Sequence, residues 1–324
     1  MSLLDRREGL PSRTVLIPVE HRPGRGRTGG WRRWLVVLAG VLALAVSGAT
    51  AVAILRGAGS QPAPAPPVPP PRVAAKPTAP VRSAAALATA AQQRAIMRLS
   101  GLGVPVFCGA ARGNEVALTF DDGPGPYTAT LLAILRRFHV QATFFLVGNR
   151  IRFWPRLAVA EAGLGAVGDH TWSHADITRL PRQAARAEVN RGRSAIAAAA
   201  RAPVRLFRIP YGRDPAWLGG YLGARGMLEI RWSVDSRDYL PGTTPAALVR
   251  RVAPGLRPGA IVLLHDIHST TVKALPRLLA RIRARHLRAV SVPELLRTDA
   301  PSYSQLMADK RGQGCVDLAT AGRE

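Results

Sequence analysis

Short apolar runs alternate with longer amphipathic segments throughout residues 104–297. The apolar runs predict strands, and the segments between them predict helices. In segment 128–138, for example, Leu131, Leu132 and Leu135 fall on one helical face. The predicted strands are 115–120, 142–146, 165–168, 204–207, 229–233, 260–264 and 288–291, and the predicted helices are 128–138, 153–162, 182–200, 216–225, 245–252 and 272–284. This alternation predicts an α/β fold with a parallel sheet, either open or closed into a barrel.

A long apolar run precedes this region. Residues 34–55 carry no charge over 22 positions, and at ~1.5 Å per residue a helix of that length crosses the ~30 Å hydrocarbon core. Four arginines stand just before the run, so the positive-inside rule puts the N-terminus in the cytoplasm and the rest of the chain outside. We expect a single-pass anchor in the cell membrane. The alternative is a cleaved signal peptide, indicated by Ala49 and Ala51, which would make the protein secreted.

The remaining segments differ from the alternating region in composition. Residues 1–33 form a basic, polar tail, and residues 56–103 form a Pro/Ala-rich linker that ends in a predicted helix at 83–100. The principal domain occupies 104–297, and a C-terminal tail occupies 298–324.

The chain is strongly basic, with a formal net charge of +25 at pH 7. Such a charge favours polyanionic surroundings, which include nucleic acids, an anionic cell wall and lipid headgroups. The sequence contains neither a nucleic-acid-binding motif nor a stripe of interleaved basic and aromatic residues. We therefore expect no nucleic-acid partner and a solvated basic surface.

The two cysteines, Cys108 and Cys315, fit no metal-binding spacing. Outside the cytoplasm they can pair. One precedes the first predicted strand and the other lies in the C-terminal tail, so a bridge would tie the tail to the start of the domain. We predict this disulfide.

Titratable side chains follow the ends of five predicted strands. In chain order these are Asp121 and Asp122, His170 and His174, Arg208, Asp235, and His265. In parallel α/β barrels the active site forms at the C-terminal ends of the strands. The pattern therefore predicts one site that collects all of these groups.

Two of these pairs indicate metal-assisted chemistry. His170 and His174 are spaced i, i+4, so a helical turn would project both imidazoles from one face, as metal ligation requires. Asp121 and Asp122 would point in opposite directions on an extended chain, so that one can bind a metal while the other acts as a base. Each signal alone is weak, because such histidine pairs are commonly incidental and Asp-Gly-Pro is ordinary turn chemistry.

Five segments, in order, resemble the motifs of the polysaccharide deacetylases, the NodB-homology domain of carbohydrate esterase family 4. They are TFDDGP at 119–124, GDHTWSH at 168–174, RIPYG at 208–212, DSRDY at 235–239 and LLH at 263–265. The resemblance covers about residues 113–297. Asp169 departs from the family's frequent Asn and would add a negative charge beside the histidines, and Tyr239 stands where a Trp is frequent.

The resemblance implies a distorted (β/α) barrel with a divalent metal. Asp122, His170 and His174 would bind this metal, and zinc is the first candidate. Three protein ligands leave positions open for water and substrate, as a catalytic site requires.

The resemblance also implies the acid–base groups. Asp121 would be the general base, with Arg208 as its ion-pair partner. His265 would be the general acid, oriented by Asp235, and the backbone N–H of Tyr211 would help to bind the oxyanion.

Motifs and expected location together favour removal of N-acetyl groups from a cell-wall glycan, first of all from the N-acetylglucosamine of peptidoglycan. One alternative is a deacetylase of chitooligosaccharide or acetylxylan. Another is an inactive wall-binding module on the same fold, although the complete set of ligands, base and acid argues against it.

Overall fold

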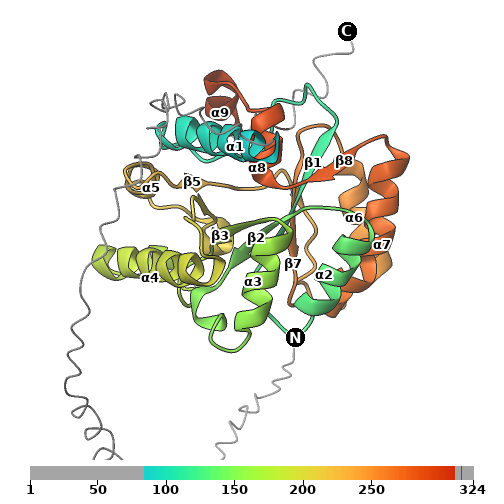
Figure 1. Cartoon of the computed structure of the whole chain (residues 1–324), viewed down its shortest axis with the longest axis horizontal. Coiled ribbons are helices and arrows are strands. Elements are labelled where there is room, and N and C mark those ends of the chain that lie inside the picture. The colour runs from blue at the N-terminus through green and yellow to red at the C-terminus, as the bar shows by residue number, and fades with distance from the viewer. Residues whose placement is uncertain (1–83, 311–314, 316–324) are drawn as a thin grey trace, which may run out of the picture. The chain divides into compact units, whose positions relative to one another are not determined.

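The computed structural model describes residues 84–310 and Cys315 (Figure 1). Its eight strands form one parallel sheet in the order β5-β4-β3-β2-β1-β7-β6, and β8 pairs with β1 beside this path. The strands are β1 Glu115–Asp121, β2 Thr143–Leu146, β3 Ala166–Asp169, β4 Leu206–Phe207, β5 Leu228–Glu229, β6 Val234–Asp235, β7 Ile261–His265 and β8 Arg288–Val290.

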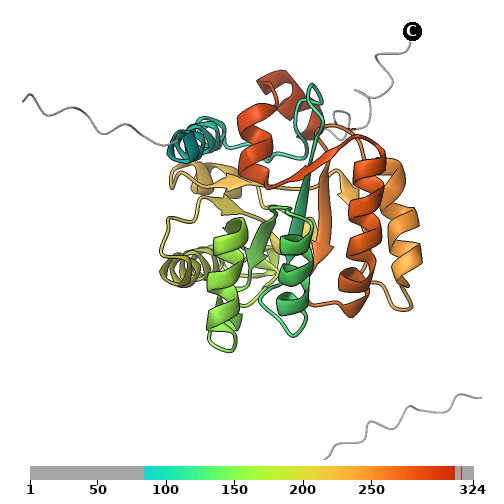
Figure 2. The same ribbon diagram turned by 45° about the vertical axis from the view of Figure 1, so that its right-hand side comes forward.

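Helices cover the outside of the curled sheet, and neighbouring helices lie side by side (Figures 1 and 2). They are α1 Ala84–Ser100, α2 Thr128–Arg137, α3 Pro155–Leu164, α4 Arg182–Ala200, α5 Leu218–Gly223, α6 Pro245–Val252, α7 Ser269–Ala284, α8 Val292–Thr298 and α9 Tyr303–Lys310. The predicted apolar face of α2 packs into the main core, where Leu131 and Leu135 are fully buried with Leu118 and Phe120 of β1. Burial of these faces holds the strands in place.

One segment links the two ends of the sheet. Val106 bridges in parallel to Ile230, just after β5, and Cys108 bridges in antiparallel to Ala260, just before β7. The sheet therefore curls towards a barrel, and this segment fills the gap between its ends. This arrangement agrees with the α/β class predicted from the alternation of strands and helices.

The prediction of one strand at 229–233 is wrong. The chain instead forms two short strands, β5 and β6, at either end of this run, because its backbone changes partners along the run. Ile230 N donates to Phe207 O at 2.8 Å, whereas Ser233 N donates to Ile261 O at 3.0 Å. The segment therefore crosses from one end of the sheet to the other. The other predicted strands and helices are present with shifts of a few residues at their ends, and α4 and α6 have the predicted bounds.

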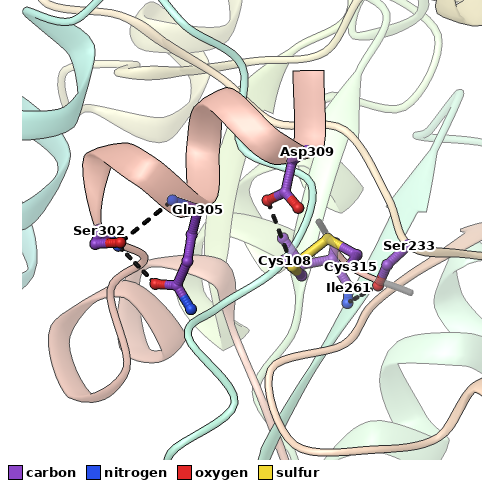
Figure 3. Close-up of a disulfide and its surroundings, with 7 residues drawn as sticks. All are labelled: Cys108, Ser233, Ile261, Ser302, Gln305, Asp309 and Cys315. Carbon is purple, nitrogen blue, oxygen red and sulfur yellow. Dashed lines mark hydrogen bonds between the residues drawn. A yellow bond between two sulfur atoms is a disulfide. The ribbon is translucent and has the colours of Figure 1, made fainter. Parts of the chain in front are cut away.

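The packed unit extends beyond the predicted limits of 104 and 297. Ile96 and Leu99 of α1 and Leu306 of α9 are buried in one core cluster with Val106 and Leu295. The Cys108–Cys315 disulfide is present, with a Cα–Cα distance of 6.2 Å (Figure 3). It joins the bridging segment to the chain that follows α9, as predicted.

Among the helices that the structure describes, none is long and apolar enough to cross a membrane. The predicted anchor at 34–55 and the basic tail before it lie outside the described residues, as does most of the Pro-rich linker.

Candidate active site

The parallel strands bring the predicted site residues to one edge of the sheet. Asp121 and His265 are the last residues of β1 and β7 and lie opposite one another in the β1–β7 register. Asp169, which precedes His170, pairs with Phe207, which precedes Arg208. Side chains from motifs 144 residues apart in sequence are therefore neighbours in the fold.

Asp122, His170 and His174 form the arrangement that could hold a metal ion. One donor atom from each lies within 4.8 Å of the other two. Oδ1 of Asp122 is 3.1 Å from Nε2 of His174 and 3.6 Å from Nε2 of His170. This oxygen is buried and has no hydrogen-bond partner among the described residues. A buried carboxylate oxygen facing two imidazole nitrogens fits a divalent cation, because the ion would supply the missing partner.

The histidines are not on a helix, contrary to the predicted helical turn. They lie in the loop after β3, where Thr171 and His174 have φ values of 66° and 61°. Asp122 has φ 72°, so the predicted extended conformation of the aspartate pair is also wrong. Left-handed conformations of non-glycine residues are costly and cluster at functional sites. Here they turn the three side chains towards one point.

His170 is held in its neutral form. Its Nδ1 lies 2.7 Å from the carbonyl oxygen of Arg208, which accepts the Nδ1 proton and leaves the lone pair of Nε2 facing Asp122. Burial lowers the pKa of His170 to about 3, so the ring is uncharged at neutral pH.

Asp121 is paired with a fully buried arginine. The Arg208 guanidinium donates to Oδ1 of Asp121 at 2.8 Å, to Oγ1 of Thr119 at 2.7 Å, and to the carbonyl oxygens of Ile230 and Arg231. Burial raises the pKa of Asp121, and the charge of Arg208 opposes that rise. Oδ2 of Asp121 remains 3.8 Å from Nε2 of His170. The carboxylate is thus fixed through one oxygen and presents the other to the candidate metal site.

Asp238, and not Asp235, orients His265. Oδ1 of Asp238 lies 2.7 Å from Nδ1 of His265, and its Oδ2 accepts the backbone N–H of His265 at 2.8 Å. Asp235 instead accepts from Arg237 N and from the hydroxyl of Tyr239. The segment DSRDY holds two aspartates, and nothing in the sequence favours the second one. The turn after β6 decides it by facing Asp238 inwards.

The protonation of His265 follows from this contact. Burial alone would lower its pKa, but the hydrogen bond and the negative charge of Asp238 outweigh burial and raise the pKa to about 9. The ring therefore carries two protons at neutral pH, and Nε2 is free to donate one.

Aromatic side chains flank the two sides of the site. The exposed ring of Tyr211 lies 4.9 Å from that of His174, and Tyr211 has φ 62°. Tyr239 and His268 lie 5.6 Å and 5.9 Å from His265. His268 therefore borders the site, whereas its sequence position favoured an ordinary surface loop residue.

Burial disfavours the negative charge expected at Asp169. The side chain is fully buried, and burial raises its pKa well above the ordinary value. In its neutral form the carboxyl group resembles the Asn that the family often has there.

Comparison with known proteins agrees with this geometry. A family model described as polysaccharide deacetylase matches residues 109–220. The peptidoglycan-N-acetylglucosamine deacetylase of Listeria monocytogenes is 32% identical over 198 residues, which cover 60% of this chain and 42% of that protein. The chain thus spans about two fifths of the length of this relative. The chitooligosaccharide deacetylase of Sinorhizobium fredii is 34% identical over 215 residues, which cover 60% of this chain and 94% of that protein.

Solved structures show the same fold. A family 4 carbohydrate esterase from Streptomyces lividans in complex with acetate has a TM-score of 0.54 at 33% identity, covering 59% of this chain and 99% of that one. A family 4 pseudoenzyme from Bacillus anthracis has a TM-score of 0.57 at 29% identity, covering 60% of this chain and 69% of that one. The family model and the match to 94% of a relative at 34% identity show that the chain belongs to the polysaccharide deacetylase family.

Proposed function

We propose that the protein is a metal-dependent deacetylase that hydrolyses N-acetyl groups of peptidoglycan N-acetylglucosamine. The observation that carries this proposal is the convergence of three groups at one edge of the sheet. These are the ligand set of Asp122, His170 and His174, the Asp121–Arg208 pair, and the Asp238–His265 pair. A cation bound by the ligand set would polarise the acetyl carbonyl and acidify a water molecule.

Asp121 would act as the general base. Its Oδ1 is held by Arg208, so Oδ2 is the oxygen free to accept a proton from the attacking water. Burial strengthens the carboxylate as a base by raising its pKa, and Arg208 keeps it in place while it takes the proton.

His265 would act as the general acid. An amine leaves poorly unless it is protonated, and the imidazolium of His265 can donate from Nε2 while Asp238 holds Nδ1. Tyr211 lies on the other flank of the site, and its backbone N–H would help to bind the developing oxyanion.

The substrate assignment is supported by the relatives. Enzymes named as peptidoglycan deacetylases stand among the relatives and among the solved structures with this fold. A second candidate is deacetylation of chitooligosaccharides. One observation favours it, because the relative that the chain covers over 94% of its length is named a chitooligosaccharide deacetylase.

The pseudoenzyme among the structures motivates the inactive alternative. In this chain every ligand, base and acid position is occupied by a competent side chain, which argues against inactivity.

Acetate release tests these assignments. The zinc-loaded protein is incubated with peptidoglycan, chitopentaose and acetylxylan, and acetate is measured over time. We expect the highest kcat/KM on peptidoglycan. A higher kcat/KM on chitopentaose would favour the second candidate, and no acetate from any of the three would favour the inactive module.

We also propose that residues 34–55 anchor the protein in the cell membrane with the deacetylase domain outside. The support is the length of the uncharged run and the arginines before it. Protease treatment of intact spheroplasts should remove the domain. A domain that stays protected would overturn this topology, and release of the domain into the medium would identify a cleaved signal peptide.

A further inference from the structure

The surface between α4 and α5 holds a group of arginines that the sequence did not reveal as a cluster. A hollow of about 530 Å³ is lined there by Arg182, Arg186, Asn190, Tyr221 and Arg225, which we call the arginine pocket. Both helices lie on the same side of the molecule (Figures 1 and 2). Within the described part of the chain, no acidic side chain lines the hollow.

Aromatic rings hold these guanidinium groups in place. Arg225 lies 3.6 Å and Arg186 lies 4.9 Å from the ring centroid of Tyr221, which is itself buried. Arg182 lies 5.5 Å from the ring of Trp217. Cation–π contacts fix the planes of the guanidinium groups while leaving their N–H donors available. The pocket is therefore preorganised to receive an acceptor.

In the described structure the guanidinium groups of the pocket lack acidic partners, and Arg225 donates from Nη1 to the carbonyl oxygen of Tyr221 at 3.1 Å. Arg182, Arg186 and Arg225 form no ion pair with an acidic side chain among the described residues. Nε of Arg186 is buried and has no hydrogen-bond partner within the same part of the chain. Oδ1 of Asn190 accepts from the hydroxyl of Tyr221 at 2.9 Å, so the amide group of Asn190 is oriented as a further donor. Unpaired guanidinium groups with a buried, unsatisfied donor suit an oxyanion ligand.

The pocket and the candidate active site are linked through one core cluster. The floor of the pocket shares this cluster with Ile177, three residues after His174, and with Ile209, next to Arg208. Trp217 follows Tyr211 by six residues along the same loop. The chain that carries His174 and Tyr211 thus continues directly into the elements that form the pocket.

We propose that the arginine pocket binds carboxylate groups of the peptides attached to peptidoglycan, so that the enzyme prefers peptide-bearing glycan to an uncharged chitooligosaccharide. This inference rests on the proposed function. Carboxylates are the anions that this substrate carries next to its sugars, and a planar guanidinium binds them through two parallel hydrogen bonds.

The test compares two double variants that remove the same charge. Arg182→Gln/Arg186→Gln changes the pocket, and Arg277→Gln/Arg281→Gln changes two exposed arginines with the same spacing on α7. We expect the pocket variant to lose about tenfold in kcat/KM on peptide-bearing muropeptides through KM, and to keep its kcat/KM on chitopentaose. The α7 variant should match the unmodified protein on both substrates. Thermal melting of each variant checks that it is folded, and Arg225→Gln alone should show a smaller loss of the same kind.

Direct binding separates this inference from the proposed function. The unmodified protein is titrated calorimetrically with muropeptides and with the same muropeptides after amidation of their carboxylates. This measurement of binding needs no turnover. The unmodified protein should bind the amidated muropeptides more weakly than the unamidated ones, and the pocket variant should bind both equally. This result would support the pocket even if no acetate is released. Three results would overturn it: equal losses in both double variants, an equal loss on chitopentaose, or binding of polyphosphate but of no muropeptide.

Discussion

Asp121 and Asp122 are adjacent in sequence, but they have different partners, so substitutions can separate their roles. Asp122→Ala should lose metal and activity together, because its Oδ1 faces both histidines. Asp121→Asn should keep the metal and lose turnover by ~10²–10⁴-fold, the usual contribution of a general base. Metal content per protein and acetate release measure both effects. Metal loss in Asp121→Asn with metal retention in Asp122→Ala would reverse the assignment.

His265 and Asp238 form a pair whose effect appears in the pH dependence. With a pKa of about 9, His265 should keep kcat/KM high at neutral pH and produce a decline at alkaline pH. Asp238→Asn removes the charge that raises this pKa, so the decline should move to lower pH. Asp235→Asn is the matched control and should leave the profile unchanged, because the hydrogen bonds that Asp235 accepts in the described structure come from Arg237 and Tyr239 and not from His265. A shift with Asp235→Asn alone would contradict the observed pairing.

The same pair affects stability. The folded-state pKa of His265 lies above its ordinary value of 6.5, so its protonated form stabilises the fold fully below about pH 6.5. This contribution is lost as the pH rises through about 9. Asp238→Asn should therefore narrow the difference in melting temperature between pH 6 and pH 10.

At the scale of elements, α4 fixes the loop that carries the histidines. A Cβ atom at Gly192 would lie 2.3 Å from Oδ1 of Asp169 and 2.6 Å from the carbonyl carbon of Thr171. Alanine normally stabilises a helix relative to glycine. Here we expect Gly192→Ala to lower the free energy of unfolding by ~1–3 kcal/mol through overpacking, and to weaken metal binding by displacing Thr171.

Gly163 in α3 provides the matched control, because a Cβ atom there would meet nothing within 4 Å. Gly163→Ala should be neutral or stabilising by up to ~1 kcal/mol and should leave metal affinity unchanged. Urea denaturation and zinc titration measure both variants. Equal behaviour of the two would show that α4 does not set the position of the loop.

At the scale of the whole molecule, the disulfide joins the two ends of the packed unit across 207 residues of sequence. Closing so long a loop stabilises the fold by up to ~5 kcal/mol in the chain-entropy model. Cys108→Ala/Cys315→Ser should therefore lower the melting temperature. It should leave the kcat/KM of the folded protein unchanged, because Cys108 pairs with Ala260, just before β7 begins, whereas His265 lies at the end of β7. Free thiols in mass spectra of the exported protein would contradict this role of the bond.

The sequence predicted most of the local structure and the edge of the sheet at which the titratable side chains gather. Alternating apolar runs predicted the parallel sheet, the bounds of α4 and α6, and the strand ends that carry Asp121, His170 and His265. These features depend on periodicity and on the rule that parallel strands end at one edge, both of which are local or topological. The run at 229–233 was misread, since a change of backbone partners leaves no mark on apolar periodicity.

Only the tertiary structure showed which of two residues close together in sequence makes a given contact. Asp238, and not Asp235, contacts His265, because the turn after β6 directs the Asp238 carboxylate towards β7. The tertiary structure also showed that His170 and His174 meet through left-handed backbone conformations and not through a helix. The arginine pocket has the same origin, since its arginines on α4 and the aromatic rings near α5 are separated along the chain. Sequence by itself determined which chemical groups are present and which strand end carries each. The fold determined their pairing and protonation, because both depend on burial and on contacts between distant segments.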